Sequence, residues 1–502
     1  MNPSRNIIAN YVGQSYVILV GIIFTPLYLN HLGAEAYGLV GIFALLQSWL
    51  ALLDLGLSPT LGRQVAYARG RKNGFEFFKR LTKSFELIFF SLALLIIIVI
   101  FLASDWIAKS WIKASTLDSN TIVYCILLMG IMIALRWFTG LYRSGINGLE
   151  DQVWLNAANM TLISLRFIGA LLLLVFITQD VRHFFEYQLA ISLIHVVVFA
   201  RRFYLNLPAT LNSPGLFAFD WLAVKSVAPY ALSVAYTAGI WLLITQTDKV
   251  ILSGILSLSE FGYFSLVALV AGSITMLSGP VSQAIMPRMT VLLAQQKKEE
   301  MLHYYRQGSQ IVTLISFNVA LMIGFYAEPL LYAWTGDRGA ASWGAEVLLW
   351  FALGNAMLAL GAFQFYLQSS FGVLKLHVIG STATGLLQVP IIFYAVLNYG
   401  VIGAGKAWFI FHLIGFLLWT PIVHRHFVPG FHLPWMLKDI LPIISLTSAL
   451  AWLCSTQFVL QLDANRLWLF IQMLGMGLVV LCVSSFSISV IRTKIMRKLK
   501  EL

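Results

Sequence analysis

Long runs of apolar residues make up most of the chain, and short segments rich in glycine or polar residues separate them. Most runs reach the length of about 20 residues that an α-helix needs to cross the hydrocarbon core of a bilayer. The pattern predicts an all-α integral membrane protein with about 14 transmembrane helices. Their expected positions are residues 7–30, 37–60, 83–103, 119–142, 154–177, 183–204, 227–254, 262–287, 308–332, 343–369, 376–397, 402–424, 437–460 and 466–490. An even number of spans places both ends of the chain on the same side.

Residues 32–83 recur about 224 residues later in recognisable form, which indicates an internal duplication. Near the start of each copy an aromatic residue precedes a glycine, as Tyr37 and Gly38 in the first copy and Phe261 and Gly262 in the second. A long apolar run then ends at a basic amphipathic segment in both copies. The shared order of loop, helix and basic segment is harder to obtain by chance than apolar composition alone.

The duplication predicts two six-helix bundles. Because each copy contains an even number of spans, the bundles are expected to be parallel repeats, facing each other in a V-like arrangement across a cleft. Two further helices follow a proline-rich connection and have no counterpart. The predicted boundaries are 1–206 for the first bundle, 207–226 for a cytoplasmic linker, 227–427 for the second bundle, and 428–502 for the last two helices and a basic cytoplasmic tail.

Composition supports this class. Hydrophobic residues make up 59% of the chain and charged residues only 11%, whereas a soluble chain carries roughly 25% charge. The first apolar stretch is too long for a secretory signal core, so the first helix is expected to remain in the protein.

Basic residues fall unevenly between the two sides. With a cytoplasmic N-terminus, the inner loops and tails hold 24 lysines and arginines and the outer loops hold 6. This bias predicts that both termini are cytoplasmic. The net charge of +12 is therefore mainly a topology signal, with a secondary attraction to anionic lipid head groups, and it needs no nucleic-acid partner.

Motifs for enzyme chemistry are missing from the sequence. Cys125, Cys454 and Cys482 lie inside apolar runs without metal-ligand spacing. The segment GVIGAGK at 400–406 has the glycine and lysine spacing of a phosphate-binding loop, but Ala407 replaces the required serine or threonine and the segment is an outer turn. No loop is long enough for a soluble catalytic domain. We therefore expect a transporter that uses no metal and no cofactor.

Charged residues at membrane depth are the candidate functional groups, because each costs about 2.5–3.5 kcal/mol to insert. Arg166 lies at the midpoint of the predicted helix 154–177, where it forms either an interhelical ion pair or part of the cleft lining. Arg136 lies about six residues, or roughly 9 Å, from the inner end of its predicted helix. It is therefore either a cleft residue or an arginine that extends to the inner surface.

Asp248 and Lys249 are adjacent, so their side chains leave the helix about 100° apart and are expected to face different partners. Either one of the two side chains faces the cleft, or both take part in packing between helices. Asp54 is either a proton-carrying carboxylate or the partner of Arg63. His195 is either a hydrogen-bonded core residue or a proton site. Asp54, Asp248 and His195 are thus the candidates for ion coupling.

The membrane-depth charges sum to a positive cleft. Three are cations, Arg136, Arg166 and Lys249, and two are the carboxylates Asp54 and Asp248. A positive passage favours an anionic cargo.

Four segments carry a resemblance to a known group: YLNHLGAEAYGLVGIFALLQSWLALLDLGLSPTLGRQVA (28–66), GINGLEDQVWLNAANMTLISLRFIGALL (145–172), TDKVILSGILSLSEFGYFSLV (247–267) and NYGVIGAGKAW (398–408). They resemble the polysaccharide-export branch of the multidrug, oligosaccharidyl-lipid and polysaccharide exporter superfamily. Within that branch the chain is most similar to the Wzx-type flippases of O-antigen repeat units.

The resemblance implies a bacterial inner-membrane protein that moves an undecaprenyl-pyrophosphate-linked oligosaccharide from the cytoplasmic to the periplasmic leaflet. It further implies alternating access, proton exchange as the drive, and a polysaccharide polymerase with its chain-length machinery as partners. Arg166 would then contact the phosphate or an acidic sugar, with Arg136 at the inner entrance and Lys249 at the outer one.

Three alternatives remain. A peptidoglycan-precursor flippase has the same number of spans and differs only in cargo. A drug or cation exporter would need a cleft dominated by carboxylates. A membrane glycosyltransferase or polysaccharide polymerase would need a sizeable outer loop, whereas the longest outer loop here, 104–118, holds only four charged residues.

Overall fold

The computed structural model describes residues 3–69, 74–207 and 219–488. Thirteen helices in this part of the chain are long and apolar enough to cross a membrane. One of them, α13 (Lys375–Phe427), has 53 residues and a non-helical backbone at Gly400, with φ 61° and ψ −147°. A straight helix of that length would extend about 80 Å, far beyond a bilayer core of about 30 Å. Counting α13 as two spans gives the predicted fourteen, and the all-α membrane fold is confirmed.

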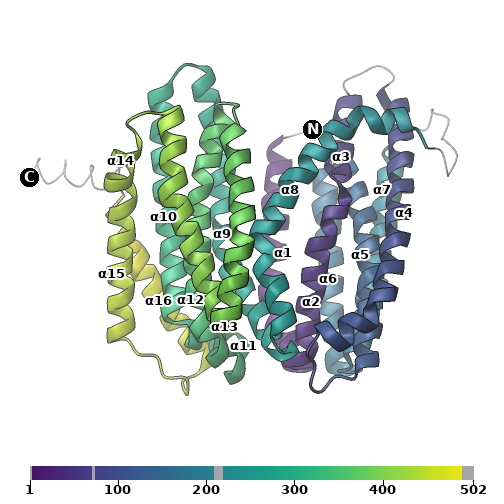
Figure 1. Cartoon of the computed structure of the whole chain (residues 1–502), viewed down its shortest axis with the longest axis horizontal. Helices are drawn as coiled ribbons and strands as arrows, with labels where there is room; N and C mark the ends of the chain where they lie inside the picture. The colour runs from purple at the N-terminus through teal and green to yellow at the C-terminus, as the bar shows by residue number, and fades with distance from the viewer. Residues whose placement is uncertain (1–2, 70–73, 208–218, 489–502) are drawn as a thin grey trace, which may run out of the picture. The chain divides into compact units, whose positions relative to one another are not determined.

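Two compact units divide the chain, Met1–Gly262 and Tyr263–Leu502. In Figure 1 the long helices within each unit run side by side. The first unit contains α1 (Pro3–Leu32), α2 (Ala34–Leu50), η1 (Ala51–Asp54), α3 (Leu57–Arg69), α4 (Gly74–Trp106), η2 (Ile107–Trp111), α5 (Ser119–Gly148), α6 (Gln152–Phe176), α7 (Val181–Leu205), α8 (Trp221–Ile255) and the start of α9 (Leu258–Ala294). Because this division follows internal contacts, α8 falls in the first unit. The repeat-based boundaries and the V-like arrangement stay predictions.

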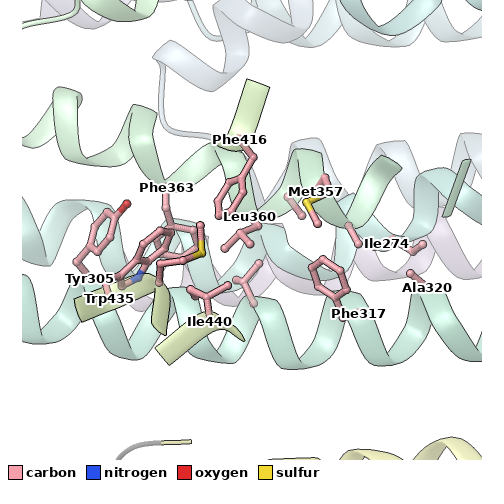
Figure 2. Packing of buried hydrophobic residues seen from close by; sticks show 14 of the residues in the cluster. Ile274, Tyr305, Phe317, Ala320, Met357, Leu360, Phe363, Phe416, Trp435 and Ile440 are labelled. Carbon is pink, nitrogen blue, oxygen red and sulfur yellow. The ribbon is translucent and has the colours of Figure 1, made fainter. Parts of the chain in front are cut away.

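The second unit continues from α9. It contains α10 (Lys298–Phe325), α11 (Ala327–Thr335), α12 (Arg338–Ser370), α13, α14 (His432–Trp435), η3 (Met436–Ile440), α15 (Leu441–Gln457) and α16 (Arg466–Ser485). The last two long helices pack against α10 and α11. Figure 2 shows the core of this unit, where Tyr305, Phe363, Phe416 and Trp435 interlock.

Polar residues between the apolar runs start several helices. The side chains of Asp118, Asp180, Asp220, Asp337 and Asn465 each accept a hydrogen bond from a backbone N–H two or three residues later. These bonds satisfy donors that the first turn of a helix leaves without a partner. These five side chains therefore cap the helices that they precede.

The two segments that the sequence predicts to be repeats differ in one helix. In the first copy the helix breaks after α2, where Leu55 and Gly56 adopt left-handed backbone angles with φ 51° and 71°. In the second copy α9 continues without a break. A Cβ at Gly56 would lie 2.3 Å from the carbonyl oxygen of Ala231 in α8, so only glycine permits both the turn and this close approach.

Candidate functional site

Arg136 lies farther from the end of its helix than the sequence predicted. Its helix, α5, extends to Gly148 rather than to residue 142. Arg136 is thus twelve residues from the inner end, a distance of about 18 Å along the helix axis. The guanidinium contacts Gln47 and Phe43 of the neighbouring helix α2, so the side chain is directed toward that helix.

Partners of Arg136 come from α2. One guanidinium nitrogen, Nη1, donates a hydrogen bond to Oε1 of Gln47. The guanidinium carbon lies 5.1 Å from the centre of the Phe43 ring, which is a cation–π contact. Among the described residues, the buried Nε has no hydrogen-bond partner. One donor of Arg136 therefore remains unsatisfied within the first unit.

Arg166 lies near the middle of α6, as predicted, and is partly buried. Its Nη2 donates to the hydroxyl of Ser192 on α7 over 3.2 Å. No carboxylate in the described part of the chain lies within 4.0 Å of either Arg136 or Arg166; the ion pairs there use other cations. The interhelical ion pair considered for Arg166 therefore does not form.

His195 on α7 belongs to the same region as the two arginines. The imidazole lies near the guanidinium groups of Arg166, Arg136 and Arg143. The imidazole packs edge-on against Phe199 at 4.6 Å between ring centres. Within the described residues its Nε2 is buried without a hydrogen-bond partner. We refer to Arg136, Arg143, Arg166 and His195 as the deep cationic cluster.

Arg143 was missed as a candidate because the sequence analysis placed it in an inner loop. The longer α5 brings it into the helix, seven residues after Arg136. Residues seven apart share one face of a helix. This spacing was visible in the sequence and could have linked the two arginines once the helix was extended to Gly148.

Asp248 and Lys249 pair with each other, contrary to the expectation of different partners. The ammonium of Lys249 lies 3.6 Å from Oδ1 of Asp248 and donates to the carbonyl of Thr245 over 2.6 Å. The long lysine side chain folds back along α8, which overcomes the difference in starting direction. Asp248 itself is only 2% exposed. Lys249 is therefore locally neutralised and adds little to the positive charge of the unit.

Asp54 does not bind Arg63. Its carboxylate accepts hydrogen bonds from the hydroxyl and, over 3.3 Å, the amide of Ser58. Arg63 instead stacks on Tyr230 with its guanidinium carbon 4.3 Å from the ring centre. Asp54 thus acts as a cap for α3 at the break in the helix.

A surface pocket of about 540 Å³ lies in the second unit. Tyr263, Trp343 and Tyr399 contribute aromatic side chains to it, and Glu346 contributes a carboxylate. Tyrosine and tryptophan are enriched wherever a membrane protein meets the lipid–water interface. The aromatic residues that line the pocket are therefore typical of a surface at the lipid–water interface.

Comparisons with known proteins agree with the class predicted from sequence. The family described as polysaccharide biosynthesis protein matches residues 4–293. No protein of curated function matches the sequence significantly. Among solved structures, the lipid II flippase MurJ in an inward closed conformation has a TM-score of 0.71 and 16% identity, covering 96% of this chain and 98% of its own.

Two other solved structures share the fold. A multidrug MATE transporter of the MOP superfamily in an inward-facing conformation has a TM-score of 0.62 and 16% identity, covering 81% of this chain and 95% of its own. A MOP-superfamily transporter from Pyrococcus furiosus has a TM-score of 0.56 and 16% identity, covering 84% and 95%. Because the family match covers more than half of the sequence, this multi-pass membrane protein belongs to the polysaccharide biosynthesis protein family.

Proposed function

We propose that the protein is a flippase that moves an undecaprenyl-pyrophosphate-linked oligosaccharide from the cytoplasmic to the periplasmic leaflet by alternating access. The observation that carries this proposal is the deep cationic cluster, whose two central arginines have no carboxylate partner among the described residues. Uncompensated charge at membrane depth is expensive and marks a functional site. An anionic cargo supplies the missing negative charge.

Pyrophosphate chemistry matches the cluster. A guanidinium offers parallel N–H donors that bind phosphate oxygens in pairs. Arg166 provides these donors, and Arg136 and His195 each add a nitrogen that has no hydrogen-bond partner among the described residues. Sugar hydroxyls and phosphate charges cannot enter hydrocarbon without replacement partners. Each negative charge that moves outward gains about 2.3 kcal/mol per 100 mV of inside-negative potential.

Other roles follow from the same proposal. Asp54, Asp248 and His195 are the candidate ion-coupling residues, and Lys249 lies on the outer part of the pathway. The protein resides in the bacterial inner membrane with both termini cytoplasmic. It delivers its cargo to a polysaccharide polymerase and the chain-length machinery. O-antigen repeat units are the cargo that the resemblance to Wzx-type flippases favours.

Flipping of lipid-linked oligosaccharide in vesicles that contain only this protein tests the proposal. We expect transport by the wild type, stimulation by a pH gradient, and a loss of roughly ten- to hundredfold in Arg166→Ala, since a hydrogen bond to a charged group contributes about 1.5–3 kcal/mol. Arg201→Ala is the matched control, because Arg201 is exposed on α7. Equal rates for all three proteins would remove Arg166 from the site, and no flipping by the wild type would overturn the proposal.

A second candidate is supported by one observation. The fold of the lipid II flippase MurJ covers 96% of this chain, and lipid II is also an anionic polyprenyl-linked saccharide. Flipping of lipid II faster than of oligosaccharide-linked carriers by the same vesicles would favour this candidate. A drug exporter is disfavoured because cationic drugs would be repelled by the deep cationic cluster.

A further inference from the structure

The surface pocket in the second unit is lined by three helices. Trp343 and Glu346 come from α12, Tyr263 from the start of α9 and Tyr399 from α13. Tyr399 directly precedes Gly400, whose left-handed backbone, with φ 61°, interrupts α13. A Cβ at Gly400 would meet no atom within 4 Å, so the backbone angles rather than a lack of space favour glycine there. The interruption ends the first half of α13 at the pocket, where Tyr399 is 68% exposed.

Glu346 is the group in the pocket that a membrane interface does not explain. It is exposed and lines the pocket. The ion pairs described in the second unit join other residues, so no cation of the described part of the chain lies within 4.0 Å of this carboxylate. Lys406 on α13 has its ammonium 5.4 Å from the centre of the Trp350 ring. The carboxylate of Glu346 is therefore available to accept hydrogen bonds from a ligand.

The chemistry of the lining fits a sugar. The three aromatic side chains offer flat apolar faces against which the C–H groups of a sugar ring can pack. Glu346 can accept from sugar hydroxyls, and such bonds to a charged acceptor are strong. The hydroxyl of Ser342 donates to the carbonyl of Gly339 over 3.3 Å and keeps its lone pairs for another donor. An apolar lining with a few polar groups is the usual composition of a small-molecule site.

Volume and charge distinguish a sugar from other ligands. The pocket has about 540 Å³, within the range of about 300–1,000 Å³ for small-molecule sites. This is more space than the single ammonium group held by an aromatic cage would fill. None of the described residues that line the pocket is basic, and Glu346 would repel a pyrophosphate. A short, uncharged saccharide satisfies both conditions.

We propose that this pocket is a saccharide-binding site, separate from the deep cationic cluster. We refer to Tyr263, Ser342, Trp343, Glu346 and Tyr399 as the saccharide pocket. In the predicted topology the segment 400–406 is an outer turn, so the pocket opens toward the outer side. Its role, which rests on the proposed function, is to hold the sugar part of the cargo after translocation. Binding of a free saccharide does not depend on that function.

A binding experiment tests the saccharide pocket without measuring transport. The probe is the free repeat-unit oligosaccharide released by mild acid from the surface polysaccharide of the organism that encodes the protein. The full-length protein is held in phospholipid nanodiscs, because detergents with sugar head groups would compete for the pocket. Isothermal titration calorimetry gives the Kd. We expect the wild type to bind, Glu346→Gln to raise the Kd about tenfold and Tyr399→Ala to raise it about fivefold.

A second tyrosine of α13 provides the matched control. Tyr394 is 64% exposed and does not line the pocket, so Tyr394→Ala should bind the oligosaccharide as the wild type does. No binding by the wild type, or equal Kd values for the wild type, Glu346→Gln and Tyr399→Ala, would overturn the proposal. Binding of choline or ethanolamine without binding of the oligosaccharide would assign the pocket to a lipid head group and would also overturn it.

Arg166→Ala separates the saccharide pocket from the proposed function. We expect this variant to lose flipping in vesicles while its Kd for the free oligosaccharide stays within about twofold of the wild type, because distant sites act independently. A loss of binding as large as in Glu346→Gln would place the sugar at the deep cationic cluster and overturn the pocket. If the wild type binds the free oligosaccharide through Glu346 but flips nothing, the proposed function fails and the saccharide pocket stands. Flipping by a wild type that does not bind the free oligosaccharide overturns the pocket alone.

Discussion

Arg136 and Arg166 both lie well inside their helices but have different surroundings. Arg136 is held by Gln47 and Phe43, whereas the guanidinium of Arg166 donates one hydrogen bond, to Ser192. A guanidinium has five N–H donors, so Arg166 retains most of its donors for another partner. We infer that Arg166 is the direct anion contact and that Arg136 mainly sets the local charge.

Lysine substitutions separate charge from geometry at these two positions. Lysine keeps the positive charge but lacks the planar fork that binds phosphate in pairs. We expect Arg136→Lys to retain most of the flipping rate and Arg166→Lys to lose roughly tenfold, because one charge-assisted hydrogen bond is worth about 1.5–3 kcal/mol. Initial flipping rates in vesicles measure this, and a greater loss in Arg136→Lys would reverse the assignment of roles.

A buried ion pair in the second unit makes a stability prediction. Asp439 is fully buried and accepts from Arg306 through Nε at 2.6 Å and Nη2 at 3.1 Å, and from Gln310 at 2.7 Å. Removing one partner of such a pair leaves a poorly compensated charge. We expect Asp439→Ala to lower the free energy of unfolding by about 2–3 kcal/mol, at the low end for buried pairs because Arg306 is partly exposed.

Thermal unfolding in detergent measures this effect. Asp463→Ala is the control, since its ion pair with Arg338 is exposed at the surface and such pairs contribute about 0–1 kcal/mol. A similar small change in both variants would mean that the Arg306–Asp439 pair does not stabilise the attachment of η3 to α10.

At the scale of elements, the break between α2 and α3 is the feature in which the two predicted copies of the repeat differ. The first copy has Asp54 as a cap and Gly56 as a turn, and the second has a continuous α9. The break lets the backbone approach α8 at Ala231. Asp54 thus has a sufficient structural role, and a role in ion coupling must be demonstrated separately.

Replacing Asp54 with asparagine distinguishes the two roles. Asparagine caps helices about as well as aspartate but carries no titratable proton. If Asp54 carries the coupled proton, Asp54→Asn should keep its thermal stability but lose the stimulation of flipping by a pH gradient. Asp54→Ala should in addition lower stability by about 1 kcal/mol. Normal gradient dependence in Asp54→Asn would leave Asp54 as a cap alone.

At the scale of the whole molecule, charge is distributed unequally between the units. The deep cationic cluster belongs to the first unit. In the second unit the buried charge of Asp439 is paired with Arg306, and other buried side chains such as Asn318 and Gln368 are neutral. The family match at residues 4–293 covers the whole cluster. We therefore expect anion recognition to depend on the first unit.

Topology is a property of the whole chain that labelling can check. The excess of basic residues on one side predicts cytoplasmic termini. In a background without the native cysteines, Lys109→Cys should react with an impermeant maleimide in intact cells, and Lys375→Cys only after permeabilisation. Both side chains are exposed. The opposite pattern would invert the topology and with it the proposed direction of transport.

Helix ends and side-chain partners were the parts of the prediction that failed. The polar run at 143–148 continues α5, because a helix need not end where the hydrocarbon does, and this moved Arg136 to mid-helix. Lys249 folds back onto Asp248, and Asp54 bonds a serine four residues away. Such choices depend on which rotamers and neighbours are available, and hydropathy carries no information about them.

The sequence by itself determined that this is an all-α membrane protein with many apolar spans and with charged residues inside some of them, because lipid leaves backbone groups no partners outside a helix and makes each buried charge conspicuous. Only the tertiary structure decided which of those residues meet. It brought Arg136, Arg166 and His195 together from three helices, and it brought Gly38 against the segment that contains Gly262. Contacts between distant segments arise from packing of helix faces, which composition and periodicity do not specify.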